Sequence, residues 1–379
     1  MGTCRVGIVT INDDTNYGNR LQNYALQEAV RSLGWEPETI RNRPPAWDRA
    51  LLAPRLLHDI RKDVVGFTRR ASTRARERVQ GSAVSAPAYL ERRRTAIREF
   101  ARTRIASSAQ VYSEMPADHW ADRYDAAIVG SDQVWNPTYR RAQGIDFLDF
   151  VGESRRIAYA ASFGIEHVPG FLRSRYRTWL NGIPQLSVRE SSGRRIVADL
   201  TGRDVPVVVD PTLLVDRSAW DRLIAAEPQI LPVPYAVRFF LGQPTPEQDA
   251  WVTRHALDTG LEVVDLHALD QERFADVGPA GFVAAIARAE VVYTDSFHAG
   301  IFSLLYRRSV VLRHRFDRDP RWQELLSQNG LSTRATEVGG LQSIAGVDWA
   351  AVETQRDLLR STSAAFLRGA LESSAVHAG

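Results

Sequence analysis

One histidine in this sequence stands where a strand is expected to end and a helix to begin. Residues 295–300, Asp-Ser-Phe-His-Ala-Gly, follow the apolar run 291–293 and precede the apolar, helix-compatible run 301–306. A helix start presents unbonded backbone N–H groups and the positive end of the helix dipole, which suits an anion. Imidazole titrates near neutral pH, so His298 could exchange a proton with a ligand bound there. A histidine at a helix start is also commonly a cap or a core residue, so the position alone leaves both roles open.

Two further loops of the same kind follow expected strands elsewhere in the chain. Residues 6–10 form an apolar run that leads into the polar loop 12–20, and residues 126–129 lead into the loop 130–137. Both loops are rich in Gly, Asn, Asp and Ser, which permit tight turns and close approach to a ligand. Ligands of open α/β sheets bind beyond the carboxyl ends of the strands, where these loops lie. Together with the His298 loop they indicate one ligand-binding cleft.

Three blocks of the sequence resemble the characteristic blocks of the polysaccharide pyruvyl transferase family. They are residues 16–27 (NYGNRLQNYALQ), 129–137 (VGSDQVWNP) and 294–300 (TDSFHAG), and the shorter stretches 187–193 and 210–214 are similar to that family as well. The resemblance covers roughly residues 5–335. It implies transfer of pyruvate from phosphoenolpyruvate to a hydroxyl of a sugar, a glycolipid or a glycosylated metabolite, giving an enol or ketal pyruvyl group.

The donor that this resemblance implies carries a carboxylate and a phosphate, so its pocket needs fixed positive charge. Arginine suits either anion, because its planar fork donates two parallel hydrogen bonds. Each candidate arginine could instead form a structural salt bridge or lie on the surface. The candidates for donor binding are Arg189, at the end of an expected strand; Arg238, a charge inside the apolar run 235–241; Arg313 and Arg315, after the run 309–312; and Ser296.

Ketal formation needs a general acid for the methylene carbon of the donor and a general base for the attacking hydroxyl. We expect His298 to transfer a proton, because it matches the family's histidine, and Asp132 to be the general base or a hydroxyl clamp; Asp132 also fits an Asx turn or a helix cap. No HExxH, paired-cysteine or clustered-aspartate pattern is present, so neither a metal nor a cofactor is expected. The candidates for acceptor binding are Asn16, Asn19, Arg20, Gln22, Ser131 and Trp135, the last of which could stack on a sugar or fill the core.

The sequence departs from the better-known family members at one position. Those often carry an arginine two residues before the histidine, where this chain has Ser296. Either Arg189, Arg313 or Arg315 supplies the missing charge, or the donor is not phosphoenolpyruvate. Two alternatives therefore stay open: a transferase of similar fold that uses a nucleotide sugar or another activated donor, and a non-catalytic binding protein. The absence of a clear ribose-holding carboxylate argues against the former, and the retained His298 argues against the latter.

Strand-like and helical runs alternate along the chain, which is typical of an α/β fold with parallel sheets. The resemblance implies two Rossmann-like domains that face each other across a cleft, the GT-B-like arrangement. We expect residues 1–185 to form the acceptor domain, with a basic helical insert at about 46–108, and residues 186–348 the donor domain. An amphipathic helix at 349–371 is expected to pack back onto the first domain. Strands are predicted at 5–11, 126–129, 157–162, 186–189, 205–209, 235–241, 262–266, 290–294 and 309–312, and helices at 247–259, 279–289 and 298–306.

Composition excludes several classes of protein. Of 379 residues, 44% are hydrophobic and 25% charged, as in soluble globular proteins, and the length allows two domains. No apolar run approaches the roughly 20 residues of a membrane-spanning helix, and the first strand leaves no room for a signal peptide. Cys4 is the single cysteine, which excludes a disulfide framework and a cysteine zinc site. We therefore expect a cytoplasmic protein.

Charge is concentrated in residues 49–104, which contain 15 basic and 5 acidic residues. That segment is near +10, and since the whole chain is +3, the remainder is near −7. A basic face could contact an anionic membrane or a lipid-pyrophosphate acceptor, or it could be a solvated helical surface. Nucleic acid is not expected, because aromatic residues are not interleaved there. Lys62 is the only lysine, so a general preference for arginine accounts for part of this charge.

Overall fold

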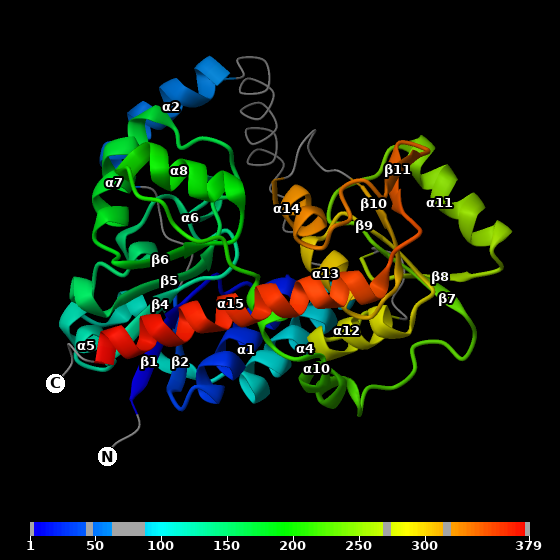
Figure 1. The fold of residues 1–379 in the computed structure, drawn as a ribbon, viewed down its shortest axis with the longest axis horizontal. Coiled ribbons are helices and arrows are strands. Elements are labelled where there is room, and N and C mark those ends of the chain that lie inside the picture. The colour runs from blue at the N-terminus through cyan, green and yellow to red at the C-terminus, as the bar shows by residue number, and fades with distance from the viewer. Residues whose placement is uncertain (1–3, 43–47, 63–87, 268–273, 314–319, 376–379) are drawn as a thin grey trace.

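The computed structural model describes residues 4–42, 48–62, 88–267, 274–313 and 320–375, and these form two six-stranded sheets with helices around them (Figure 1). The first sheet is parallel throughout, with the order β3-β2-β1-β4-β5-β6. This is the strand order of a Rossmann domain. Its strands are β1 (Arg5–Val9), β2 (Glu36–Arg41), β3 (Ser107–Val111), β4 (Ala126–Val129), β5 (Arg156–Ala161) and β6 (Gln185–Val188).

The second sheet has the order β11-β12-β10-β9-β7-β8. Its four parallel strands are β7 (Tyr235–Phe239), β8 (Glu262–Asp265), β9 (Val291–Thr294) and β10 (Ser309–Leu312). An antiparallel hairpin of β11 (Ala335–Val338) and β12 (Leu341–Ile344), which the sequence did not predict, extends the β10 edge. The predicted α/β fold is confirmed, with two mainly parallel, Rossmann-like sheets.

One predicted strand, at residues 205–209, is wrong. Its backbone meets the end of β6 only through Pro206 and Val208, at an isolated bridge of Val207 with Val188. Pro206 cannot donate to a ladder, and Pro211 begins a helix two residues after the run ends, so pairing has no room to extend.

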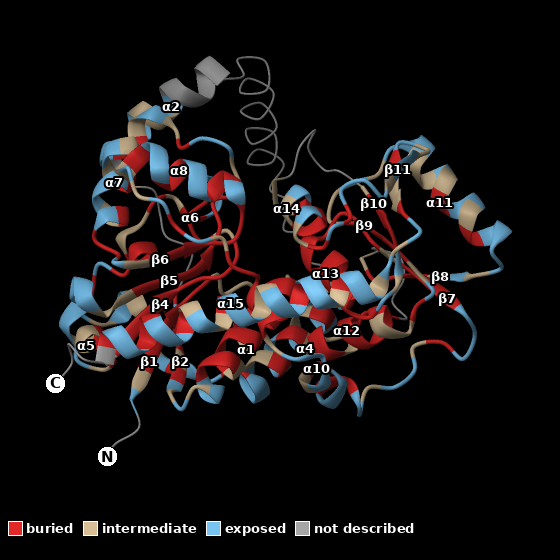
Figure 2. Cartoon of the chain, in the orientation of Figure 1, coloured by how far each residue is buried: buried red, intermediate tan, exposed pale blue. Residues whose placement is uncertain are grey.

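Helices cover both sheets, and burial alternates along them as amphipathic packing requires (Figure 2). The basic insert contributes α2 and α4, while its residues 63–87 lie outside the described part of the chain. No helix among the described residues is long and apolar enough to cross a membrane. The α-helices are α1 (Tyr17–Ser32), α2 (Arg49–Lys62), α4 (Ala88–Arg104), α5 (Ala117–Ala121), α6 (Pro137–Arg140), α7 (Arg173–Asn181), α8 (Ser191–Thr201), α9 (Pro211–Leu214), α10 (Arg217–Ile224), α11 (Pro246–Asp258), α12 (Pro279–Arg288), α13 (Phe297–Leu305), α14 (Pro320–Gln328) and α15 (Trp349–Ala375).

Apolar packing joins the two halves of the molecule, the first built around the sheet of β1 to β6 and the second around the sheet of β7 to β12. Helix α1 belongs to the first half, yet its Tyr17 ring stacks on Phe282 of α12, with centroids 4.8 Å apart. Leu21 and Ile97 lie in the same buried cluster as residues of the second half such as Phe302. The start of α1 is therefore held against the second half.

The C-terminal helix α15 runs across both halves (Figure 1). Near its start, the Glu353 carboxylate accepts two hydrogen bonds from Arg307 of the second half, at 2.8 and 2.6 Å. Farther along, the Ser363 hydroxyl accepts a bond of 3.1 Å from the Val209 amide, and Leu367 is buried in a cluster that includes Ile157 of β5. The helix thus contacts the second half near its start and the first half toward its end.

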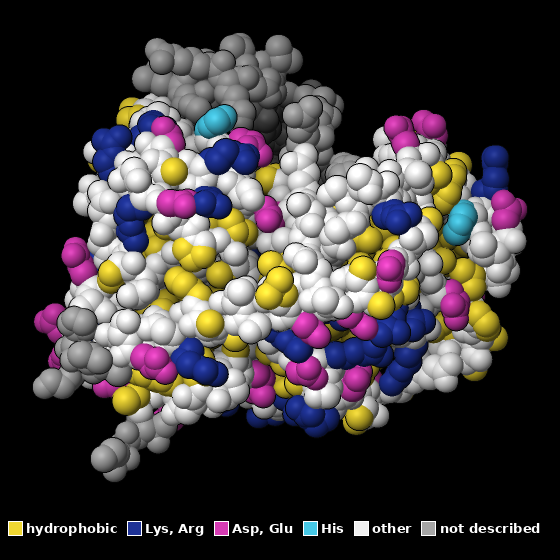
Figure 3. Space-filling model, viewed as in Figure 1, with side chains coloured by type: hydrophobic (Ala, Val, Ile, Leu, Met, Phe, Trp, Pro, Cys, Tyr) yellow, Lys and Arg dark blue, Asp and Glu magenta, His cyan; other side chains and the backbone are white. Residues whose placement is uncertain are grey.

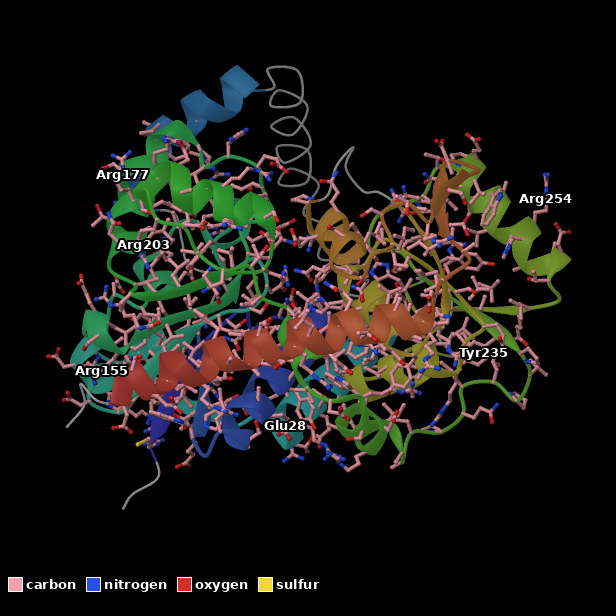
Figure 4. The ribbon with its side chains drawn as sticks, in the orientation of Figure 1. Glu28, Arg155, Arg177, Arg203, Tyr235 and Arg254 are labelled. Carbon is pink, nitrogen blue, oxygen red and sulfur yellow. The ribbon has the colours of Figure 1, made fainter. Side chains whose placement is uncertain are left out.

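Many arginines donate hydrogen bonds to backbone carbonyls or form ion pairs with acidic side chains. Arg155, Arg177 and Arg203, labelled in Figure 4, all donate to backbone carbonyls, for example Arg203 to Leu180 and Ile183 at 2.9 Å. Carbonyls at helix ends lack partners within the helix, and a guanidinium can bind two of them at once. Figure 3 shows basic and acidic side chains interspersed on the face that carries α15. The arginine preference is thus largely structural in the described part of the chain.

Candidate functional site

The loop after β4 and the first turns of α1 meet at the carboxyl end of the first sheet. Asp132 has a φ of 70°, a left-handed conformation that Asp tolerates better than most residues, and its carboxylate accepts a hydrogen bond from the side-chain Nδ2 of Asn19. The Ser131 amide donates to the Gln22 side chain at 3.1 Å. Gln22 in turn donates to the hydroxyl of Thr10, at the end of β1, at 2.8 Å. The predicted acceptor residues Asn19, Gln22 and Ser131 therefore lie in one network with Asp132.

Arg189, directly after β6, is the centre of a buried charge cluster. One of its guanidinium nitrogens, Nη1, donates to Asp210 Oδ2 at 2.8 Å, and Nη2 donates to Asp132 Oδ1 at 3.4 Å. Its Nε lies 3.7 Å from Glu190 Oε2. The guanidinium carbon also lies 4.6 Å from the centre of the Phe297 ring, a cation–π contact with α13. Arg189 therefore contacts the carboxylates of Asp132, Glu190 and Asp210 and, through Phe297, the start of α13.

His298 reaches this cluster from the second half. Its Nε2 lies 3.7 Å from Asp210 Oδ2, an ion-pair distance that is too long for a hydrogen bond. Its ring packs on Gly18 of α1, where an added Cβ would lie 2.6 Å from the imidazole Cγ, so only glycine admits the ring there. The Ser296 hydroxyl accepts from the Ala299 amide and caps α13, which fixes the turn that carries the histidine.

The charges of the cluster stabilise one another. Burial alone would raise the pKa of Asp210, but His298, Arg189 and the Thr212 amide hold it well below its usual range. Burial likewise opposes the charge of Arg189, yet its carboxylates raise its pKa above the ordinary value. For Glu190, burial dominates and raises the pKa, with Arg189 acting against it. Asp210 and Arg189 therefore remain an ion pair, and Asp210 is the carboxylate that Arg189 and His298 share.

The other predicted donor-binding arginines lie apart from this cluster. Arg238 pairs with Asp249 of α11 at 2.7 Å and with Asp265 of β8 at 3.2 Å. Arg313 pairs with Asp295 at 2.6 Å, and the same carboxylate accepts from the Leu241 and Gly242 amides. Arg315 lies outside the described residues. The structure brings Arg189 and Ser296 together with His298, while Arg238 and Arg313 bind acids of the second half.

Three predicted acceptor residues have structural partners. The Asn16 side chain caps α1, accepting from the Asn19 amide at 3.3 Å, and Arg20 pairs with Asp14 at 2.5 Å. Trp135 is 0% exposed, stacks on Phe147 with centroids 5.4 Å apart, and donates Nε1 to the Asp146 carbonyl. Of the two roles that the sequence allowed for Trp135, the structure shows the core role, because no ring face is open to a sugar.

Sequence reasoning missed two residues of the site, Asp210 and Arg321. A small pocket borders the cluster between α9, α13 and α14, and Arg321 lies in its wall 5.8 Å from the Phe297 ring centre. The Asp-Pro-Thr motif at 210–212 carried a signal for Asp210, since an aspartate before Pro and Thr is a typical helix cap. Among the described residues, no group of three or more His, Cys, Asp or Glu side chains could hold a metal ion. The pocket is lined by Arg189, Asp210, Leu213, Phe297, Arg321, Glu324, Leu325 and Gln328.

Comparison with known proteins gives one family match. The sequence profile described as polysaccharide pyruvyl transferase matches residues 16–312. No curated protein matches the chain. Similar solved structures include UDP-GlcNAc 2-epimerase from Neisseria meningitidis bound to UDP-GlcNAc, with 10% identity, a TM-score of 0.44 and 86% of each chain covered. Another is E. coli ADP-heptose lps heptosyltransferase II, with 13% identity, a TM-score of 0.35, and 94% of this chain and 99% of that chain covered.

Proposed function

Because the chain belongs to the polysaccharide pyruvyl transferase family, we propose that it moves pyruvate from phosphoenolpyruvate to hydroxyls of a sugar, a glycolipid or a glycosylated metabolite. Phosphoenolpyruvate is then a co-substrate, and no other cofactor takes part. We also propose a cytoplasmic location, which fits the free, exposed thiol of Cys4.

The observation that carries this proposal is the arrangement of His298 and Asp132 around Arg189. Asp210 Oδ2 lies 2.8 Å from Arg189 Nη1 and 3.7 Å from His298 Nε2, and Asp132 Oδ1 lies 3.4 Å from Arg189 Nη2. A candidate acid from one half and a candidate base from the other thus flank one fixed positive charge. Such a charge, held in place by buried carboxylates, stabilises negative charge in a transition state without reorganising.

The proposed chemistry uses these groups in turn. Protonated His298 donates its proton to the methylene carbon of the donor, while the oxygen of an acceptor hydroxyl bonds to the adjacent carbon and Asp132 accepts the hydroxyl proton. A second acceptor hydroxyl then attacks the same carbon, the carbon–oxygen bond to phosphate breaks, and phosphate leaves with the second proton. Asp132 returns its proton to solvent, from which His298 is reprotonated.

Arg321 is our proposal for the positive charge that Ser296 does not supply. Arg189 and Arg321 approach the same Phe297 ring, at 4.6 and 5.8 Å, and both line the pocket beside the cluster. Ser296 itself is occupied as the cap of α13. A donor anion bound beside the Phe297 ring would meet two guanidiniums.

One observation favours the alternative, a transferase with a nucleotide sugar or another activated donor. Three carboxylates, Asp132, Asp210 and Glu190, surround Arg189, and they repel a donor as anionic as phosphoenolpyruvate. The two readings differ in which donor the protein binds.

Calorimetric titration with phosphoenolpyruvate, and separately with nucleotide sugars, tests the proposal. We expect phosphoenolpyruvate to bind, Arg321→Met to weaken binding about tenfold or more through loss of a charge-assisted contact, and the exposed control Arg254→Met (Figure 4) to leave it unchanged. Carbon-labelled phosphoenolpyruvate with glycan and lipid extracts should then yield a labelled pyruvyl product by mass spectrometry. Binding of a nucleotide sugar without binding of phosphoenolpyruvate would favour the alternative.

A further inference from the structure

Helix α4 carries a buried positive charge that is not part of the site described above. Its buried face consists of Tyr89, Arg93, Ile97 and Phe100, three large hydrophobic residues and one arginine. Arg93 is 5% exposed, and its Nε and Nη2 atoms have neither solvent contact nor a hydrogen-bond partner. A guanidinium cannot lose its proton to escape this, so its burial without an anion is unfavourable.

The other buried arginines in the part of the chain that the structure describes are paired. Arg20 binds Asp14, Arg140 binds Asp146 at 2.5 Å, Arg189 binds Asp210, and Arg356 donates to the Leu304 carbonyl. Arg93 differs from them, because its buried Nε and Nη2 atoms have no hydrogen-bond partner. A missing anion is the simplest physical account of that difference.

Arg93 lies at the seam between the two halves, beside the first turn of α1. The preceding residue, Arg92, forms an ion pair with Asp276, just before α12. The Tyr17 hydroxyl donates to the Val277 carbonyl at 2.8 Å. Burial raises the pKa of Tyr17 to about 12, and the charge of Arg93 acts against that rise, as expected for a neighbouring cation.

Positive charge exceeds negative charge around this turn. Asp14 is shared by Arg20, at 2.5 Å, and Arg98, at 3.1 Å, so two guanidiniums have one carboxylate between them, and Arg93, five residues before Arg98 on α4, adds a third positive charge. The Nε of Arg20 is also buried without a partner. The first turn of α1 contains no acidic residue, so the dipole of this 16-residue helix adds to the positive potential.

We propose that Arg20, Arg93 and Arg98 form a second anion site, which binds a phosphate or diphosphate ester carried by the acceptor. The assignment to the acceptor rests on the proposed function, whereas the anion site does not. Asn19 bonds Asp132 and Arg20 follows it in the chain, so the site adjoins the candidate base on the acceptor side. A sugar phosphate could thus present a hydroxyl to Asp132 and its phosphate to the arginines.

Titration with inorganic pyrophosphate, in the presence of saturating phosphoenolpyruvate, tests the site. We expect the wild type to bind, Arg93→Met to bind about tenfold or more weakly, and Arg94→Met, an exposed arginine paired with Glu91 on the same helix, to bind as the wild type. Without ligand, Arg93→Met should melt at a higher temperature than the wild type, since it removes an uncompensated buried charge. Equal binding by wild type and Arg93→Met, or no binding by the wild type, would overturn the proposal.

The same variants separate this site from the proposed function. Pyrophosphate binding that depends on Arg93, without any binding of phosphoenolpyruvate, would support the anion site and contradict the proposed pyruvyl transfer. Phosphatidylcholine vesicles with and without a polyprenyl diphosphate identify the source of the anion. Co-sedimentation that requires the diphosphate and Arg93 identifies a lipid-linked acceptor, and pyrophosphate binding without co-sedimentation identifies a soluble one.

Discussion

The contact of His298 with Gly18 predicts the effect of a single methyl group. An added Cβ at Gly18 would lie 2.6 and 2.9 Å from the imidazole Cγ and Cε1, and closer still to Nδ1, whereas real Cβ contacts are wider than 3.0 Å. The backbone itself accepts alanine, because residue 18 has ordinary helical geometry in α1. In an unobstructed helix, Gly→Ala stabilises by up to about 1 kcal/mol. Overpacking costs about 1–3 kcal/mol, and the close approach to Nδ1 favours the upper part of that range, about 2–3 kcal/mol, so after the gain in helix propensity Gly18→Ala should destabilise by about 1–2 kcal/mol.

A double-mutant cycle isolates the cause. If the imidazole is the obstacle, Gly18→Ala in the His298→Ala background should stabilise by up to about 1 kcal/mol, which gives a coupling energy of about 2–3 kcal/mol. Urea unfolding of the four proteins measures these free energies, and pyruvyl transfer measured in parallel should fall in Gly18→Ala, because the clash displaces His298.

The refuting results are specific. If Gly18→Ala is as stable as the wild type or more stable, then the ring does not pack on α1 as described. A cost that is the same in both backgrounds would place the obstacle elsewhere than in His298. Either result would also remove the geometric basis for placing the candidate acid beside Asp210.

Three further predictions concern buried groups. His298→Ala should lower the turnover number about 10²–10⁴-fold at saturating donor, because it removes the proton donor, and unchanged specific activity would assign the histidine a packing role. Asp210→Asn should cost about 3–5 kcal/mol in urea unfolding, because it leaves Arg189 short of its nearest counter-ion, and a loss below 1 kcal/mol would contradict the ion pair. Burial raises the pKa of Asp146 to about 6, opposed by Arg140, so the folded state binds this proton more tightly than the unfolded state, and ionisation costs stability as the pH rises from about 4 to 6. Asp146→Asn should therefore gain about 3 kcal/mol relative to the wild type across that interval in urea titrations, and a difference that does not change with pH would refute the shift.

The sequence predicted strands where apolar residues run together and missed those held by distant partners. Strands β4 and β9 are continuous apolar runs, and both were placed to within a residue. Strand β2 reads EPETIR, which contains a proline and two glutamates. It forms an inner strand because Glu38 accepts from Arg123 and Tyr124, residues far away in the sequence. No local pattern reveals such a pairing.

The candidate site shows the same division. The resemblance picked out Arg189 and His298, which the structure brings together, although their roles remain predictions. The shared carboxylate between them, Asp210, is 21 residues from one and 88 from the other, so no spacing pattern connects it with either residue. From the sequence, Arg238 and Arg313 were plausible donor ligands, because the acidic residues that pair with them are distant along the chain. Arg313 and Asp295, for example, follow two different strands.

The C-terminal helix limits how the two halves can move. Its contact with the second half at Glu353 and its contact with the first half at Phe366, whose ring centre lies 6.4 Å from that of Tyr159 of β5, are 13 residues apart, or about 20 Å along a rigid helical rod. A rod anchored at both points keeps them at constant separation, so the halves cannot simply move apart along it. What remains is rotation about the axis of α15. We therefore expect substrate entry to occur by rotation of one half relative to the other about the axis of α15, and not by separation of the two halves.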